Sequence, residues 1–318
     1  MPGAAELRAI RRRIRSVKSM QKITRAMELI AASRIGRARE AVESARPYAK
    51  AIVQVIRDLA AENEVSDHPL LRPREEGQRV GIVVLSSDRG LAGAYSTNVL
   101  RRAQRLAEEE GSEGRDVNIY AAGRKSENYF RFRNIPITES WTGFSEKPSY
   151  ADAQAIADRV IDDYTEEQID KVWLVYTDFR SALTQVPTAQ RILPVDPTQF
   201  EGGEGFGPQF LFEPEPAEIL ETLIRRYVEH QFFAGLLESA ASEHASRQRA
   251  MKAATDNAGD VIEDLTRQAN AARQAAITTE IAEIVGGAEA LSDTTGQGNA
   301  SPDAQYETSQ TDQREPVG

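Results

Sequence analysis

No proline interrupts the chain between Pro216 and Pro302. Residues from Pro216 to about Ala290 therefore read as one helix, and about 75 residues at about 1.5 Å each span roughly 110 Å. A helix of that length does not fit inside a compact domain. Its apolar stripe is thin: Met251, Ala254, Ala258, Val261 and Leu265, resuming at Ile277, Ile281 and Ile284. So thin and alanine-rich a stripe predicts close packing against one other helix.

A second long helix is predicted at the beginning of the chain, from about Ala4 to Ala60. Its first apolar positions have the spacing of a coiled-coil seam: Leu7, Ile10, Ile14 and Val17. After an extra three-residue step, which would locally overwind the supercoil, we expect the seam to continue through Met20, Ile23, Met27 and Ile30. Pro47 is expected to kink this helix or to start a new segment, because proline removes an internal hydrogen bond.

The residues between about Arg79 and Pro197 have a different pattern. Three short runs are rich in β-forming residues: RVGIVVLSS, DVNIYAAG and KVWLVYTDF. Candidate helices lie between them, at Ser96–Glu110, Arg124–Arg133 and Tyr150–Tyr164. Because strands that alternate with helices form parallel sheets with crossover helices, this segment predicts a Rossmann-like α/β domain.

We therefore expect an α/β insert domain plus a long antiparallel coiled coil formed by the N- and C-terminal helices. The predicted parts are the N-terminal coiled-coil helix 1–60, the α/β (Rossmann-like) domain 79–197, a Gly/Pro-rich connector 198–215, the C-terminal coiled-coil helix 216–291 and a disordered acidic tail 292–318. If the helices pair outward from the domain, the second outruns the first by about 20 residues, roughly 30 Å. A single helix of that length is marginal in water, so we expect another protein to surround it.

Composition excludes several kinds of site. The chain has no cysteine, which excludes a disulfide framework, a thiolate metal site and a cysteine nucleophile. His68, His230 and His244 are scattered, without metal-ligand spacing. The longest apolar run, VGIVVL, is far shorter than the roughly 20 residues of a membrane span. We therefore expect no metal, no cofactor and no membrane-spanning segment.

Charge is unevenly distributed along the chain. Residues 1–46 carry twelve Arg or Lys and four Glu, a net charge of +8, although the whole chain carries −10. Residues 292–318 carry five acids and one Arg, a net charge of −4. The positive charge of this N-terminal segment indicates an acidic binding partner. One alternative is a basic-zipper type of DNA-binding protein, but in RRRIRSVKSMQKITR the seam residues lie among the arginines and no leucine heptads follow.

The SSDRGLAGAYS loop, Ser86 to Ser96, follows the first predicted strand and begins a helix. Such loops bind ligands in many α/β domains, and helix N-termini favour anions. Gly90 and Gly93 do not complete a dinucleotide or P-loop motif, so a tight turn with a helix cap is the simpler interpretation. A hydrolase is a further alternative, disfavoured because no G-x-S-x-G nucleophile motif occurs. The sequence pattern by itself therefore predicts a pair of long helices with an α/β domain, in a chain that binds an acidic protein.

Four long segments occur in a recognisable order: SVKSMQKITRAMELIAASRI, SSDRGLAGAYSTNV, LIRRYVEHQFFAGLLESAASEHASR and AMKAATDNAGDVIEDLTRQANAARQAAITTEIAEIVGGAEAL. Together they resemble the γ subunit of F-type ATP synthases, over about residues 1–291. The resemblance implies that the paired helices form a central shaft inside a sleeve of α and β subunits. Proton-driven rotation of the membrane c-ring would then be coupled to ATP synthesis, or ATP hydrolysis to reverse rotation.

The resemblance also implies partners and contact residues. It implies a non-catalytic subunit, one copy per complex, that binds the α, β and ε subunits and the c-ring but no nucleic acid. It implies a peripheral membrane protein on the cytoplasmic face of the cell membrane, attached only through the complex. The implied rotor–stator contacts are Arg273 and Gln274 with β-subunit loops, Arg89 with a lower part of a β subunit, and Met27, with Lys22 and Arg25 nearby, where the shaft passes an acidic β-subunit lever.

The chain departs from the family pattern at three places. The loop reads GLAGA, with Ala92 and Ala94, where the family often has a cysteine in GLCGG. The two-cysteine regulatory insert of chloroplast-type forms is absent, which excludes that dithiol control. The segment Ser292–Gly318 lies beyond the family's usual end. We hypothesise that this tail modulates rotation.

Overall fold

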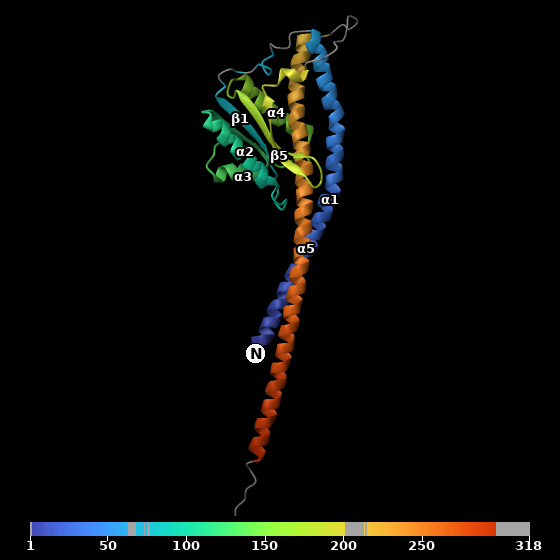
Figure 1. The fold of residues 1–318 in the computed structure, drawn as a ribbon, viewed down its shortest axis with the longest axis vertical. Helices are drawn as coiled ribbons and strands as arrows, with labels where there is room; N and C mark the ends of the chain where they lie inside the picture. Colours follow the sequence, from blue (N-terminus) through green and yellow to red (C-terminus); the bar gives the residue numbers. More distant parts are fainter. Residues whose placement is uncertain are drawn as a thin grey trace, which may run out of the picture. The chain divides into compact units, whose positions relative to one another are not determined.

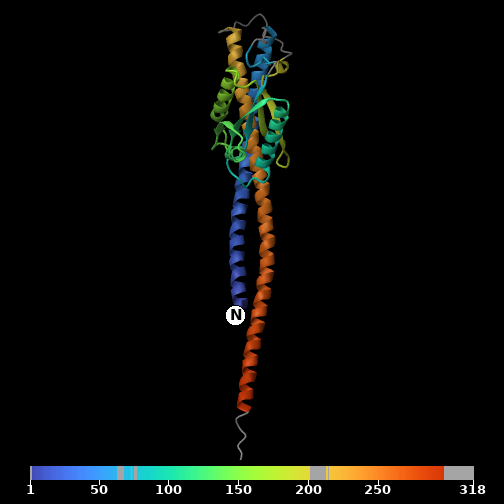
Figure 2. The same cartoon turned by 90° about the vertical axis from the view of Figure 1, so that its left-hand side faces the viewer.

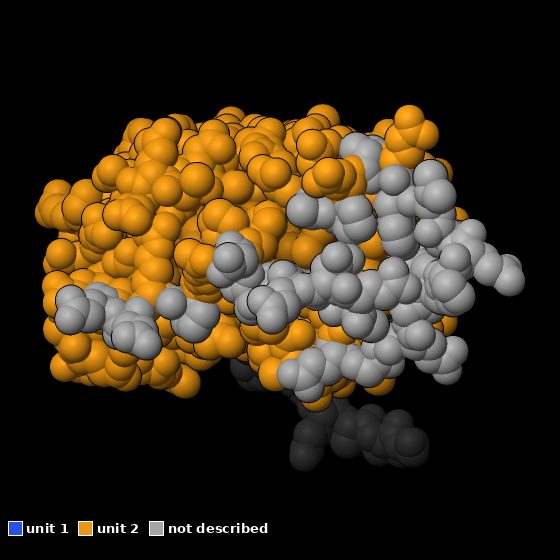
Figure 3. Space-filling view, turned by 90° about the horizontal axis from the view of Figure 1, so that it is seen from above, with its two compact units in different colours: residues 1–18, 260–318 blue, residues 19–259 orange. Residues whose placement is uncertain are grey.

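The computed structural model describes residues 2–62, 68–72, 74, 77–200, 213 and 215–296. The chain divides into two compact units, one of Met1–Lys18 with Asp260–Gly318 and one of Ser19–Gly259. Figure 3 shows the larger unit in orange. Of the predicted tail, residues 292–296 belong to a helix and residues 297–318 lie outside the described residues. Most of the predicted connector, 201–212 and 214, also lies outside them.

The two long helices predicted from the sequence are confirmed. Helix α1 runs over Pro2–Glu62 and helix α5 over Pro216–Gly296, and each contributes to both units. Helix α1 continues through Pro47, so the new segment that the proline predicted does not start there. The lost hydrogen bond is tolerated because the flanking turns pack: the ring of Tyr48 lies 5.5 Å from that of His230, and Ile52 is buried.

Within the unit Ser19–Gly259 the two helices pair in antiparallel fashion, as expected. Thr255 Oγ1 donates a 2.8 Å hydrogen bond to Thr24 Oγ1, whereas Tyr48, further along α1, contacts His230, which comes earlier in α5. The seam prediction for this part of α1 is wrong. The buried positions are Thr24, Glu28 and Ala31. They continue the heptad spacing of the first seam residues without the extra three-residue step. The polar side chains are tolerated in the seam because each has a partner: Thr24 is hydrogen-bonded to Thr255 of α5, and Glu28 to Arg25.

In the unit of Met1–Lys18 and Asp260–Gly318, α1 and α5 lie side by side, and both Figure 1 and Figure 2 show α5 continuing past the N-terminus. Leu7, Ile10, Ile14 and Val17 are half-buried, as a two-helix seam requires. On α5, Leu265 and Ala269 are buried. One predicted seam position is wrong: Val261 is 41% exposed, and the half-buried neighbour is Ile262.

Five strands form one sheet in the order β3-β2-β1-β4-β5. They are β1 (Arg79–Leu85), β2 (Asp116–Ala122), β3 (Ile137–Trp141), β4 (Lys171–Phe179) and β5 (Gln185–Leu193). The predicted parallel pairing holds for β1 to β4, but β5 runs antiparallel to β4. The five residues between β4 and β5 are too few for a crossover, so the chain returns as a hairpin. The fold class is that predicted, with a mixed sheet.

Helices cover both faces of the sheet (Figure 1). Helices α2 (Tyr95–Ser112) and α3 (Arg124–Phe132) pack on one face. Helix α4 (Tyr150–Thr165) covers the other face together with α1 and α5, whose buried Ile56 and Phe232 belong to the same core cluster. A capping box between Ser149 and Asp152 starts α4, and a short 3-10 helix, η2, spans Pro197–Phe200. None of the described helices has the length and hydropathy needed to cross a bilayer.

Candidate partner-binding site

A second apolar stripe runs along α1, outside the seam. We call it the outer stripe, and it consists of Met20, Ile23, Met27 and Ile30. Met20, Ile23 and Ile30 are 57%, 53% and 54% exposed, and Met27 is half-buried. Steps of three, four and three residues place the four on one face of the helix. An ordered row of exposed large apolar side chains is typical of a surface that binds another protein.

Basic residues lie beside the outer stripe. Lys22 is exposed and forms no ion pair within the described residues. Arg25 donates a 2.9 Å hydrogen bond to Glu28, which is buried on the seam side of the same helix. Of the two cations expected near Met27, Arg25 is thus paired within its own helix, whereas Lys22 has no ion pair among the described residues.

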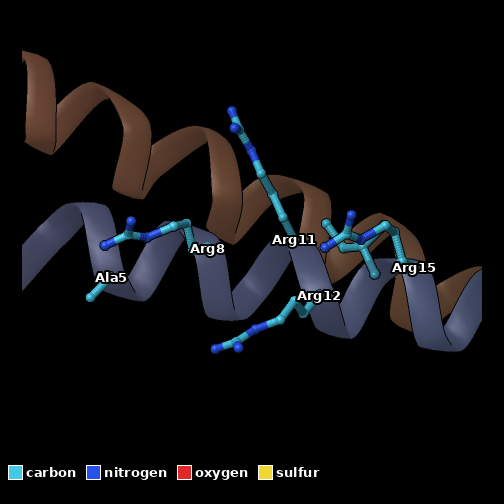
Figure 4. Close-up of a pocket in the computed structure, with 6 residues that line it drawn as sticks. Ala5, Arg8, Arg11, Arg12 and Arg15 are labelled. Carbon is cyan, nitrogen blue, oxygen red and sulfur yellow. The ribbon is translucent and has the colours of Figure 1, made fainter.

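Four arginines surround a shallow hollow near the N-terminus (Figure 4). Arg8, Arg11, Arg12 and Arg15 line a space of about 760 Å³ together with Ala5 and Ile14. Arg11 and Arg12 point in opposite directions, so the guanidinium groups do not converge on one ligand. None of the four forms an ion pair in the part of the chain that the structure describes. They form a diffuse positive surface, as expected for an extended acidic partner.

The last part of α5 presents the predicted polar pair to solvent. Arg273 and Gln274 are both exposed. The apolar stripe that follows is also exposed, at Ile277, Ile281, Ile284, Val285 and Leu291. In this segment the helix buries none of its described side chains.

The Ser86–Ser96 loop uses its polar groups to connect neighbouring loops. The Asp88 carboxylate accepts hydrogen bonds from the amides of Gly143 at 2.9 Å, Ser145 at 3.0 Å and Arg124 at 3.0 Å. Arg124 is the first residue of α3, so the chain's own carboxylate occupies a helix N-terminus where an anionic ligand could bind. Of the simpler interpretation, a tight turn with a helix cap, the geometry supports the turn. The cap on the following helix is not found, because Ala94 at the N-terminus of α2 makes no side-chain hydrogen bond to that helix, and Asp88 binds the first amide of α3 instead.

A glycine makes this close packing possible. Gly123 has φ of 104°, and a Cβ atom there would lie 2.3 Å from the carbonyl oxygen of Ser86. Only glycine combines that conformation with that approach. Ser86 Oγ in turn accepts a 2.8 Å hydrogen bond from the Ser126 amide.

Arg89 projects from this loop, and its side chain is 73% exposed. One of its nitrogens lies 3.5 Å from Glu146 Oε2, the oxygen that also pairs with Arg34 of α1. Burial acts to raise the pKa of the Glu146 carboxyl, but the hydrogen bond from Arg34 and the charges of Arg247 and Arg89 hold this pKa below its ordinary value. Arg89 is therefore available to a partner and is held near α1 by a carboxylate.

Helix α5 packs against the Ser86–Ser96 loop, at the carboxyl end of the strands. Arg247 donates a 3.3 Å hydrogen bond to the Gly90 carbonyl, and a Cβ on Gly93 would lie 3.6 Å from that of Ala250. The edge where α/β domains commonly bind ligands is thus covered by the chain's own helix. Within the described residues, no group of three or more acidic or histidine side chains could hold a metal ion.

The structure brings some of the predicted residues together. Lys22, Arg25 and Met27 lie within two turns of α1, and Glu146 links Arg89 to that helix through Arg34. Arg273 and Gln274 belong to the other unit. Sequence reasoning missed Glu146, Arg34 and Arg247, because pairs separated by about a hundred residues leave no signal in spacing.

An α/β domain inserted between antiparallel helices, with an outer apolar stripe and with arginines that form no ion pair among the described residues, is typical of a subunit of a protein assembly. Residues 6–291 match the family model described as ATP synthase. The chain is 53% identical over 294 residues to an ATP synthase gamma chain of Frankia casuarinae, covering 91% of this chain and 98% of that one. It is 50% identical to that of Mycobacterium tuberculosis, covering 91% and 99%. The chain belongs to the ATP synthase gamma chain family.

Solved structures have the same fold. A chain of the Euglena gracilis mitochondrial ATP synthase, from an OSCP/F1/c-ring structure, matches with a TM-score of 0.65 and 16% identity, covering 96% of this chain and all of that one. A chain from the central stalk and c-ring of the Tetrahymena thermophila enzyme matches with a TM-score of 0.56 and 23% identity, covering 73% and 99%. None of the proteins named here is a DNA-binding protein, so the DNA-binding alternative gains no support.

Proposed function

We propose that this chain is the rotating central shaft of an F-type ATP synthase. Rotation of the membrane c-ring, driven by proton flow, turns the shaft, and the shaft imposes different conformations on the catalytic β subunits in sequence. Because the coupling is reciprocal, ATP hydrolysis drives the reverse rotation. The chain carries torque and performs no catalysis. Family membership supports this function.

The observation that carries the proposal is the exposed end of α5. A helix with Ile277, Ile281 and Ile284 on its surface needs a partner that surrounds it, because a lone helix is marginal in water. The sleeve is the ring of α and β subunits. The α and β subunits must bind the helix only weakly at each rotational angle. A stripe interrupted by alanine and small polar residues suits rotation, because it buries little apolar surface at any one angle.

Six side chains are the contacts we assign to the β subunits: Arg273, Gln274, Arg89, Met27, Lys22 and Arg25. The outer stripe supports the assignment of Met27, since that residue lies in the middle of it. Lys22, which forms no ion pair within the described residues, suits an acidic lever. An exposed pair of this kind contributes about 1 kcal/mol or less, which permits transient contact during rotation.

The α/β domain and the adjoining helices bind the ε subunit and the c-ring, with one copy of the chain per complex. The chain is then a peripheral protein on the cytoplasmic face of the cell membrane, held there by the complex alone. The predicted tail would modulate rotation from within or beyond the sleeve.

The experiment is to express tagged wild-type and Arg273→Ala chains as the only copy in cells and to purify the complex. We expect the α, β and ε subunits and the c-ring with both chains, and an ATP turnover about fivefold lower for Arg273→Ala, equivalent to about 1 kcal/mol. Arg267→Ala is the control, since Arg267 is an exposed arginine of the same helix that pairs with Asp264 at 3.2 Å. Recovery of the wild-type chain without α and β subunits would overturn the function. Equal turnover of the two variants would overturn only the role of Arg273.

A further inference from the structure

Five charged side chains from four separate segments meet where α5 passes the carboxyl ends of the strands, within the unit Ser19–Gly259. We call them the charge cluster: Arg34 of α1, Arg89 of the β1–α2 loop, Glu146 of the β3–α4 loop, and Glu243 and Arg247 of α5. None of its five members belongs to the outer stripe. Nothing in the proposed contacts with other subunits requires Glu146, Glu243 or Arg247.

Arg247 is the buried cation of the charge cluster. Its side chain is 7% exposed and donates hydrogen bonds to Glu243 Oε1 at 2.6 Å and to the Gly90 carbonyl at 3.3 Å. Its other terminal nitrogen, Nη1, lies 3.3 Å from Glu146 Oε1, an ion pair without the geometry of a hydrogen bond. Arg247 therefore connects α5 to two loops of the α/β domain.

Glu146 connects the same loops to the other helix. While Oε1 faces Arg247, Oε2 pairs with Arg34 of α1 and lies 3.5 Å from Arg89. The backbone carbonyl of Glu146 lies 2.9 Å from His244 Nε2 of α5. A single residue of the domain thus contacts both antiparallel helices. Asp88 fixes the loop that carries it, through the amides of Gly143 and Ser145.

Stability alone does not account for this arrangement. Glu243 is fully buried, and burial raises the pKa of its carboxyl, a cost that the Arg247 charge opposes. Buried ion pairs contribute little compared with apolar side chains of similar volume. What hydrogen bonds add is direction, because they tolerate only small changes in angle and distance. Here the directional contacts are those of Arg34 with the Glu146 carboxylate, of His244 with the Glu146 carbonyl, and of Arg247 with Gly90, while the Arg247–Glu146 ion pair adds attraction. The apolar packing nearby, where Phe232 of α5 and Leu174 of β4 belong to one core cluster, has no such directional requirement.

We propose that Glu146 and Arg247 form a torsional joint, which holds the α/β domain and both helices in fixed angular register so that torque passes between the domain and the shaft. The inference rests on the proposed function and adds positioning residues to it. A twist of α5 against the domain displaces Arg247 from Glu146 and Gly90, and a twist of α1 displaces Arg34 from the same carboxylate. The joint therefore resists both motions through one residue of the domain.

The test compares Glu146→Gln with Glu110→Gln in the purified, membrane-reconstituted complex. Glu110 is a matched control: its side chain is 7% exposed against 19% for Glu146, and its partners Arg115, Lys171 and Trp173 all lie in the α/β domain. Both carboxyls have a pKa held below the ordinary value by basic neighbours in spite of burial. The readouts are ions pumped per ATP hydrolysed and the torsional stiffness of single rotors.

We expect Glu146→Gln to lower the pumping ratio and the stiffness about twofold or more while hydrolysis continues, and Glu110→Gln to leave both at the wild-type values. Equal ratio and stiffness in the two variants would overturn the joint. If Glu146→Gln does not assemble, Arg34→Gln decides, because Arg34 is a half-exposed cation whose loss removes only the α1 arm. Wild-type stiffness in Arg34→Gln would then overturn the proposal. Failure of the proposed function is a separate result, since the wild-type chain would not be found in the complex.

Discussion

Asp170 illustrates how one side chain fixes two strands at the start of the sheet. Its carboxylate accepts hydrogen bonds from the amides of Gln78 at 3.1 Å and Arg79 at 3.0 Å, just where β1 begins. It also pairs with Arg74 at 3.2 Å and Arg79 at 3.1 Å. Burial acts to raise the pKa of this carboxyl, but the hydrogen bonds from Arg79 and Arg74 outweigh burial and lower the pKa. Asp170 therefore favours the folded state only when it is ionised.

We predict that Asp170→Asn lowers the free energy of unfolding by about 2 kcal/mol at pH 7, because the variant leaves charged partners without a carboxylate. A depressed folded-state pKa gives stability that is fully present above the unfolded value of 3.8 and is lost as pH falls through the folded value. The difference between variant and wild type should therefore shrink between pH 5 and pH 3. Urea unfolding of the full chain across that range measures it, and a gap that stays constant or widens in acid would contradict the assignment.

Single residues also mark the limit of what the sequence predicts. Arg89 was singled out by its motif, and the structure leaves it exposed beside α1. Glu146 and Arg247 were not, because the loop and helix that carry them are separated by about a hundred residues and meet only through the fold. Local spacing reports which face of an element a residue occupies, but it carries no information on distant partners.

At the scale of elements, the type and order of the helices and strands could be predicted from the periodicity of apolar residues. The register of the seam on α1 could not. Helix lengths, the three apolar strands and the helices between them were predictable from long patterns. Strands β3 and β5 were not, because ITESW and QVPTAQRIL lack a buried apolar run. The seam of α1 passes through Thr24 and Glu28, whose polar groups are paired with Thr255 of α5 and with Arg25. Large apolar residues were expected there, yet they lie outside in the outer stripe.

The corrected register of α5 makes a prediction about two neighbouring apolar residues. Leu265 is 4% exposed and Val261 is 41% exposed. Leu265→Ala should lower the free energy of unfolding by about 2 kcal/mol, since it removes a buried side chain from a two-helix contact. Val261→Ala should change it by less than about 0.5 kcal/mol, because alanine favours the helix and little burial is lost. Thermal unfolding of the full chain, followed by circular dichroism at the helix band, compares the two.

Equal destabilisation by the two substitutions would return Val261 to the seam and contradict the register. A larger effect of Val261→Ala that appears only in the complex would instead indicate contact with a partner. The heptad spacing makes the same kind of prediction for α1. Substitution of Ala31, which is buried in the seam, should lower the free energy of unfolding more than substitution of the exposed Ile30.

At the scale of the whole molecule, the chain leaves the end of α5 incomplete on its own. Every described side chain from Ile277 to Glu289 is exposed. Gly286 and Gly287 lie within this segment with no atom within 4 Å of where a Cβ would stand, and each costs a helix about 1 kcal/mol relative to alanine. Neither packing nor propensity stabilises this part of the helix. Its order must come from whatever surrounds it.

Hydrogen–deuterium exchange tests that dependence in the free chain and in the assembled complex. Amides of residues 277–289 should exchange rapidly in the free chain and about 100-fold or more slowly in the complex, because a surrounding sleeve removes the open states that allow exchange. Residues 228–244 are an internal control, since Val228, Phe232 and Ala241 are buried by the α/β domain and should be protected in both states. Slow exchange of 277–289 in the free chain would mean that the helix is stable alone. Fast exchange in both states would mean that the complex does not enclose it, and the exposed isoleucines would then need a different partner.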